Sequence, residues 1–116
     1  MRERADKEPL VIEKRRYARA TIEVPVLFAE KGSSQVASGV GRDISIGGIF
    51  IETATPAAFR KEILVRVRLR TASHGEQDFD LPGVVRWVRS GGMGVQFGLL
   101  GVLETHGITE LTKTMR

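Results

Sequence analysis

The fold class is decided by the stretch Ile63-Leu64-Val65-Arg66-Val67-Arg68-Leu69-Arg70. Every second residue, from the isoleucine onward, is apolar, and three of the four residues between them are arginines. Successive side chains of a strand point to opposite faces, so this period of two buries one face and leaves the other in water. The stretch is therefore predicted to be a strand of an antiparallel sheet.

Short runs rich in apolar and β-branched residues lie on both sides of this strand, with turn residues between them. The predicted strands are residues 21–29, 36–42, 49–52, 63–70, 79–89 and 93–97. The tail differs, because Thr109 can cap a short C-terminal helix that begins after Gly107. Several short strands at this spacing predict an all-β fold, either a small barrel or a sandwich.

The chain of 116 residues is long enough for one modest hydrophobic core. Residues 1–14 are rich in charge and are predicted to form a flexible leader, followed by a single domain over residues 15–116. Eighteen Lys and Arg against fourteen Asp and Glu give a net charge of +4, which favours an anionic partner.

Composition also excludes several classes of site. The chain has no cysteine, so it has no disulfide, thiolate zinc site or Cys nucleophile, and its two histidines make a poor metal site. The sequence offers no arrangement of nucleophile, base and oxyanion donors, so we expect no catalytic residues, no cofactor and no enzyme. It has no apolar run long enough to span a membrane and no signal core, so the expected compartment is the cytoplasm.

The first of two short motifs is the basic segment Arg15-Arg16-Tyr17-Ala18-Arg19. Arg15 and Arg19 each present a planar fork of five donors, which suits a phosphate or the O6/N7 edge of a guanine. Arg16 lies between them and reaches either phosphate or solvent. Taken alone, the segment would be interpreted as a solvated basic arm.

The second motif is Asp43-Ile44-Ser45-Ile46-Gly47-Gly48, on a turn between two predicted strands. The carboxylate of Asp43 can accept the N1 and N2 hydrogens of a guanine, with the Ser45 hydroxyl beside it. Gly47 and Gly48 allow the backbone to approach a ligand or to turn with positive φ. A turn stabilised by its own side chains is the structural alternative, and it is compatible with binding. Together the motifs predict a split site for an anionic ligand that carries guanine.

The spacing Arg-x-x-x-Arg followed by Asp-x-Ser-x-x-Gly resembles the signature of PilZ domains, the bacterial receptors for cyclic di-GMP. The likeness continues in Gly83-Val84-Val85-Arg86-Trp87 and in Gly94-Val95-Gln96-Phe97, which are similar to late strands of that family. It covers residues 15–100. The resemblance implies a six-stranded antiparallel β-barrel with a flexible basic N-terminal arm and a short C-terminal helix.

The resemblance also implies roles for the motif residues. Arg15 and Arg19 would clamp phosphates and guanine edges from the arm, while Asp43, Ser45 and Gly48 would hold a guanine on the barrel. The ligand would order the arm and so pass the level of the second messenger to an unidentified protein partner, in the control of motility or biofilm formation. We expect a monomer or a weak dimer.

Trp87 is the only tryptophan, and its position decides whether it belongs to the site. It lies either in the core or on an outer face, where it would stack on a guanine.

Two other functions fit the same sequence. A PilZ-like barrel that does not bind nucleotide would act as a protein adaptor, although the intact motifs argue against this. A small basic barrel that binds single-stranded nucleic acid is less expected, because one Trp, one Tyr and five Phe provide few stacking platforms.

Overall fold

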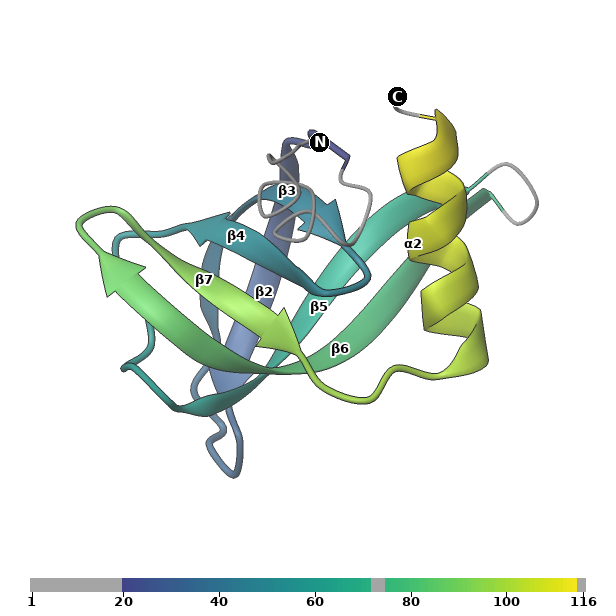
Figure 1. Ribbon diagram of the computed structural model, residues 1–116. Coiled ribbons are helices and arrows are strands. Elements are labelled where there is room, and N and C mark those ends of the chain that lie inside the picture. The colour runs from purple at the N-terminus through teal and green to yellow at the C-terminus, as the bar shows by residue number, and fades with distance from the viewer. Residues whose placement is uncertain (1–19, 72–74, 115–116) are drawn as a thin grey trace, which may run out of the picture.

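Six strands close into an antiparallel barrel, and a single helix follows them (Figure 1). The structure is a computed structural model that describes residues 20–71 and 75–114. Its elements are β2 (Val24–Glu30), β3 (Ala37–Ser45), β4 (Gly48–Glu52), β5 (Glu62–Thr71), β6 (Gly75–Arg89), β7 (Gly92–Phe97) and α2 (Val102–Thr114). The predicted six-stranded antiparallel barrel with a C-terminal helix is confirmed.

The order of strands around the barrel is β2-β3-β4-β7-β6-β5, and all neighbours are antiparallel. Pairing of β2 with β5 closes the barrel, with Val26 opposite Val67 and Phe28 opposite Val65. The four strands β3, β4, β7 and β6 form one continuous wall, named the motif wall because β3 carries the second motif. Strands β2 and β5 complete the barrel on the opposite side.

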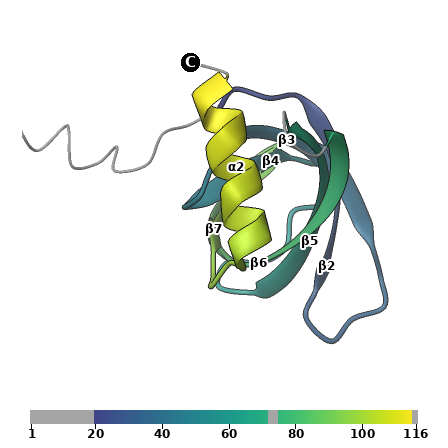
Figure 2. The ribbon, with the colours of Figure 1, turned by 90° about the vertical axis from the view of Figure 1, so that its right-hand side faces the viewer.

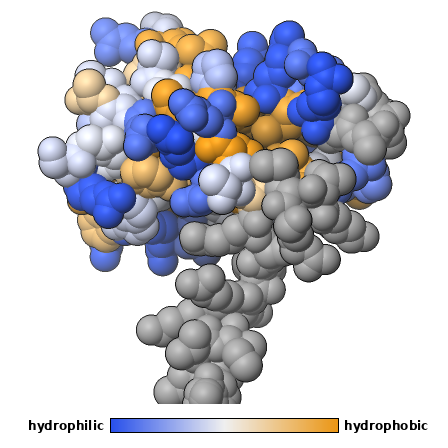
Figure 3. Space-filling view, turned by 90° about the horizontal axis from the view of Figure 1, so that it is seen from above, coloured by the Kyte–Doolittle hydropathy of each residue, from blue (hydrophilic) through white to orange (hydrophobic). Residues whose placement is uncertain are grey.

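The core fills the inside of the barrel with apolar side chains from all six strands. The alternation that predicted β5 is observed, because its apolar residues face inward and its arginines face water. Burial of each such aliphatic side chain contributes about 1.5–3 kcal/mol, and this is the main force that holds the strands together. On the face of the molecule that Figure 3 shows, groups of hydrophobic residues lie between hydrophilic ones. The fully buried strand residues include Ile44, Ile51, Val65, Val67, Leu81, Val85 and Met93.

The outward arginines of β5 form a ladder of ion pairs with carboxylates of β6. The pairs are Arg66 with Asp80 at 2.7 Å, Arg68 with Asp78 at 2.9 Å and Arg70 with Glu76 at 3.3 Å. Each pair joins residues directly opposite one another in the β5–β6 register. The arginines lie on the strand face that was predicted to be in water, and there they and the carboxylates of β6 are exposed groups that neutralise one another.

Helix α2 lies in front of one end of the barrel in Figure 2 and packs against β5 and β3. It begins at Val102, so the predicted start after Gly107 is wrong. Gly107 is buried inside the helix with Phe79 against it, and a Cβ there would lie 2.7 Å from the Phe79 ring. A close tertiary contact therefore explains this glycine, rather than a helix boundary. In the described part of the chain, no helix has the length and apolar character needed to cross a membrane.

Candidate functional site

The first motif lies outside the described residues, and so do its Arg15, Arg16 and Arg19. The described chain begins at the next residue, Ala20, which forms a two-way hydrogen-bonded pair with Ile44. The Ala20 N–H donates to the Ile44 carbonyl at 2.8 Å, and the Ile44 N–H donates to the Ala20 carbonyl at 2.9 Å. Ile44 is part of the second motif. The chain therefore enters the barrel beside that motif.

Asp43 is the extra residue of a β-bulge in β3. Arg42 pairs with Phe50 and Ile44 pairs with Ile49, so the register leaves Asp43 without a partner on β4. Strict alternation from the inward-facing Gly41 would point Asp43 into the core. The bulge instead turns Ile44 inward, where it is fully buried, and Asp43 stays partly exposed. A carboxylate is thereby kept at the surface next to a buried strand.

The turn after β3 is fixed by its own hydrogen bonds. Ser45 is 8% exposed, and its hydroxyl oxygen accepts a bond of 3.1 Å from the Gly47 N–H. The Gly47 carbonyl accepts a bond of 3.0 Å from the Phe97 N–H on β7. Gly48 lies so close to β7 that a Cβ there would overlap the Val95 carbonyl oxygen. The turn interpretation is correct, and it leaves the Ser45 O–H free to donate.

A second bulge sets the position of Trp87. Val85 pairs with Val95 and Trp87 pairs with Gly94, so Arg86 is the extra residue on β6. Val85 is fully buried, and strict alternation would bury the residue two positions later as well. The bulge reverses this, and Trp87 is 43% exposed on the outer face. The core alternative for Trp87 is therefore excluded.

Trp87 belongs to a compact group that also contains Phe50 and Arg89, called the ring cluster below. The Phe50 and Trp87 rings are stacked with their centroids 5.4 Å apart and their planes 18° apart. The Arg89 guanidinium carbon lies 5.1 Å from each ring centroid. Gly94 makes this possible, because a Cβ on that residue would overlap the Trp87 indole. The indole therefore lies against the backbone of β7 and reaches towards β4.

The two bulges lie at the same level of the motif wall. They separate two rows of paired residues, Ile44–Ile49–Val95–Val85 and Arg42–Phe50–Gly94–Trp87. Asp43 lies between the rows on β3, and Arg86 lies between them on β6. The bulged strands are three strand spacings apart, about 14 Å along the sheet. The Asp43 carboxylate on β3 and the Arg86 cation on β6 thus lie at the same level of the wall, at its two opposite edges. The ring cluster lies beside this level.

Positive charge that no carboxylate neutralises gathers at the β6 edge of this wall. Arg66, Arg68 and Arg70 all pair with acids, and Arg42 pairs with Glu52 at 3.2 Å and with Glu23 at 3.4 Å. Among the described residues, no carboxylate pairs with Arg86 or Arg89, which flank Trp87 and Val88. Two arginines without a carboxylate partner are therefore available next to the exposed tryptophan.

The ion-pair ladder has a clear electrostatic signature. Hydrogen bonding from Arg68 lowers the pKa of Asp78, and hydrogen bonding from Arg66 lowers the pKa of Asp80. The same bonds raise the pKa of each arginine. The ladder therefore favours the ionised form of both carboxylates.

Phe50 and Arg89 are candidate site residues that the sequence did not single out. Phe50 belongs to a short strand whose apolar sequence does not show which residues face outward, and β4 turns Ile49 and Ile51 inward and Phe50 outward. Arg89 stands two residues after Trp87, and the recurrence of an arginine beside the only tryptophan was the available signal. The contacts of Phe50 and Arg89 with Trp87 depend on the bulge at Arg86, which the sequence does not reveal.

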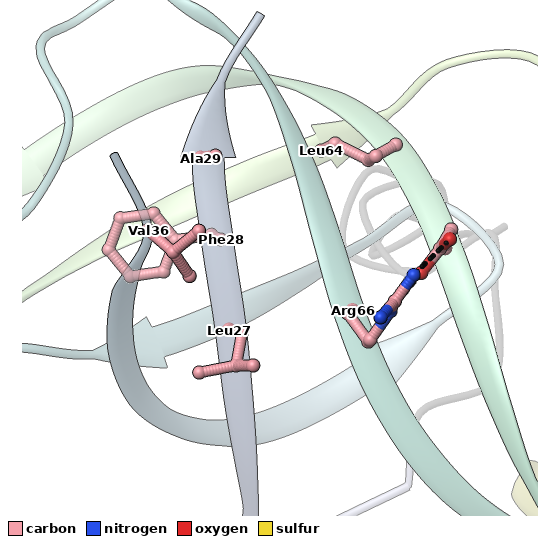
Figure 4. Close-up of a pocket in the computed structure, with 7 residues that line it drawn as sticks. Leu27, Phe28, Ala29, Val36, Leu64 and Arg66 are labelled. Carbon is pink, nitrogen blue, oxygen red and sulfur yellow. Dashed lines mark hydrogen bonds and ion pairs between the residues drawn. The ribbon is translucent and has the colours of Figure 1, made fainter. Parts of the chain in front are cut away.

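A separate groove of about 230 Å³ is lined mainly by residues of β2 and β5 (Figure 4). Its polar groups are Arg66 and Asp80, which bind one another, so it offers a nucleotide few free donors or acceptors. Among the described residues, no three His, Cys, Asp or Glu side chains gather where they would hold a metal ion. The groove is lined by Leu27, Phe28, Ala29, Val36, Leu64, Arg66 and Asp80.

Three solved structures of bacterial proteins have the same fold. The inhibitor of motility MotI/DgrA of Bacillus subtilis aligns with a TM-score of 0.72 at 16% identity, over 86% of this chain and 50% of that one. This chain thus spans half the length of that protein. The PilZ domain of CeSA from a cellulose-synthesising bacterium aligns with a TM-score of 0.65 at 20% identity, over 83% and 95% of the two chains. The PilZ domain of YcgR from Escherichia coli, solved with cyclic di-GMP, aligns with a TM-score of 0.69 at 10% identity, over 88% and 91%.

At these identities the three structures establish the fold. None of the curated proteins matches the chain. The family model of the PilZ domain, however, matches residues 13–107, which include both motifs and all six strands. The chain therefore belongs to the PilZ domain family.

Proposed function

We propose that the chain is a receptor for cyclic di-GMP that transmits the level of this second messenger to a protein partner. The observation that carries the proposal is the pairing of Ala20 with Ile44. Arg19 is bonded covalently to Ala20, and Ile44 stands between Asp43 and Ser45. The first motif is thus tethered within one residue of the second, as a ligand held by both would require.

The barrel residues supply recognition of a guanine. The Asp43 carboxylate accepts the N1 and N2 hydrogens of the base, and the Ser45 hydroxyl donates to an adjacent acceptor. Gly47 and Gly48 keep Cβ atoms away from the turn, so the ligand meets backbone there. The hydrogen bonds that fix the turn support this role, because a preorganised site gives up less entropy when the ligand binds.

The arm supplies positive charge. Arg15 and Arg19 bind phosphate oxygens and guanine edges through bidentate contacts, and Arg16 adds a further contact to phosphate. Trp87 completes the site by stacking on a guanine from the outer face of the motif wall, where it is exposed. Cation, carboxylate and ring are the three kinds of group that a guanine dinucleotide requires.

Membership of the PilZ family supports this assignment, since the PilZ domain of YcgR was solved with cyclic di-GMP. Ligand that contacts both arm and barrel fixes the arm against the motif wall and so alters the surface offered to a partner. Control of motility is the output in keeping with the inhibitor of motility among the similar structures, and control of biofilm formation is the alternative.

The test is calorimetric titration of the purified chain with cyclic di-GMP, beside cyclic di-AMP, GMP and a short oligonucleotide, each at two salt concentrations. Saturable binding of cyclic di-GMP, with weaker binding of the other ligands, is the expected result. Absence of cyclic di-GMP binding would refute the proposal and make the chain a protein adaptor. Preference for the oligonucleotide, with affinity that falls steeply with salt, would make it a nucleic-acid binder.

A further inference from the structure

Arg89 occupies the ring cluster in a way that the fold alone does not require. Its guanidinium lies 5.1 Å from the centroids of both Phe50 and Trp87, which are themselves 5.4 Å apart. The three groups therefore stand at the corners of a nearly equilateral triangle. The guanidinium is a flat cation on an aromatic surface, which is the position that a planar base would take.

Arg89 differs from the other arginines of β5 and β6 in what holds it. The ladder arginines are each bound by a carboxylate directly opposite, at 2.7–3.3 Å. Arg89 has no carboxylate partner among the described residues. The residue opposite it on β7 is Gly92, which has no side chain. A cation held by ring contact alone at an exposed site is held weakly and keeps its hydrogen-bond donors available.

We propose that Arg89 is a ligand-binding residue that covers the ring cluster in the free protein and moves to a ligand phosphate when a base stacks on Trp87. This inference rests on the proposed function and adds to it a residue and a conformational step. The exchange is balanced, because the base replaces the cation on the ring while the freed guanidinium gains a charge-assisted bond to phosphate. No main-chain hydrogen bond has to break.

The single tryptophan allows this step to be observed directly. Trp87 fluorescence is recorded for the purified full chain with and without cyclic di-GMP, and affinity is measured by calorimetry on the same samples. Arg89→Ala is expected to change the Trp87 emission of the free protein, because the cover is removed, and to weaken binding about tenfold or more. Arg89→Lys keeps the charge and loses the planar group, so it should share the emission change and retain more affinity than the alanine variant.

Arg70→Ala is the matched control. It removes the same charge from an exposed strand position outside the motif wall, and we expect it to bind cyclic di-GMP and to fluoresce like the unaltered chain. Unaltered affinity and emission in Arg89→Ala, with normal binding by the unaltered chain, would overturn this inference and leave the proposed function standing. Failure of the unaltered chain to bind would instead overturn the proposed function, and the role of Arg89 with it.

Discussion

Replacement of Gly94 by alanine is expected to displace Trp87 from the ring cluster while the barrel stays folded. Gly94 lies opposite Phe50 on one side and Trp87 on the other, and a Cβ there would overlap the Nε1 and Cε2 atoms of the indole. The backbone of β7 has little room to yield, because Met93 and Val95 on either side are buried in the core. The exposed indole is the part that moves.

The size of the effect follows from the contacts that are lost. Separation of the two stacked rings costs about 0.5–1.5 kcal/mol. Loss of the guanidinium contact costs a further 0.5–1 kcal/mol or so, as for an exposed cation–π pair. Alanine also increases the free energy of unfolding by about 0.5–1 kcal/mol, because it restricts the unfolded chain more than glycine does. The free energy of unfolding should therefore fall by only about 1 kcal/mol.

Binding should suffer more than stability. Stacking of a base on an aromatic side chain contributes about 1–3 kcal/mol, so loss of the Trp87 surface should weaken cyclic di-GMP binding by about 5- to 150-fold. Urea unfolding gives the first quantity and calorimetric titration the second. Trp87 emission reports the displacement itself, since the sequence has one tryptophan.

Gly98→Ala provides the matched control for this substitution. It adds the same methyl group just after β7, where the nearest atom, the Pro82 carbonyl oxygen, would be 3.8 Å away. We expect it to leave emission and affinity unchanged. If Gly94→Ala keeps the emission of the unaltered chain, Trp87 has not been displaced and the structural reasoning is refuted. If the emission changes while the affinity does not, the ring cluster is not part of the binding site.

Three other predictions test the motifs and the ladder. Asp43→Ala should weaken cyclic di-GMP binding by about 1–3 kcal/mol in calorimetry, the range of a bidentate base contact, whereas Asp78→Ala should not; equal affinities would exclude the guanine contact. Arg15→Ala and Arg19→Ala should each reduce affinity severely without changing the unfolding midpoint, and a lower midpoint would reveal a structural role instead. The pKa values of Asp78 and Asp80 are lowered in the folded chain, so their stabilisation is present above pH ~4 and disappears as the pH falls through the folded values. Asparagine at both positions should flatten the loss of stability in acid, measured by urea unfolding at several pH values, and an unchanged slope would contradict this.

The sequence predicted the parts of the fold that depend on local pattern. Alternation over residues 63–70 identified β5 because one face of that strand is buried and the other is solvated. Closure through β2 and β5 could not be derived in this way, since pairing of Val26 with Val67 joins residues distant in sequence, and it came from the family resemblance. The start of α2 was misplaced because helix propensity treats Gly107 as a break, while its contact with Phe79 overrides propensity.

The candidate site could be predicted as a set of residue types more easily than as a surface. Asp43, Ser45 and Gly48 were found because their side-chain chemistry and spacing are both visible in the sequence. The exposure of Trp87 could not be found, because period-two alternation from the buried Val85 points it inward. A bulge at Arg86 reverses the orientation, and neither Arg86 nor the residues beside it signal a bulge by their type.

Closure of the barrel limits how a signal can leave this domain. Every strand is hydrogen-bonded on both sides, so a change in barrel shape would break main-chain bonds that the buried core also holds in place. Side chains on the motif wall are under no such constraint, because Trp87 and Arg89 are exposed and contact one another only through ring and cation. Ala20, where the described chain begins, joins the same wall through its pair with Ile44. Under the proposed function, a ligand bound there would alter the outer surface and the arm while the barrel remains a fixed support, and a protein partner would have to bind that surface rather than a rearranged sheet.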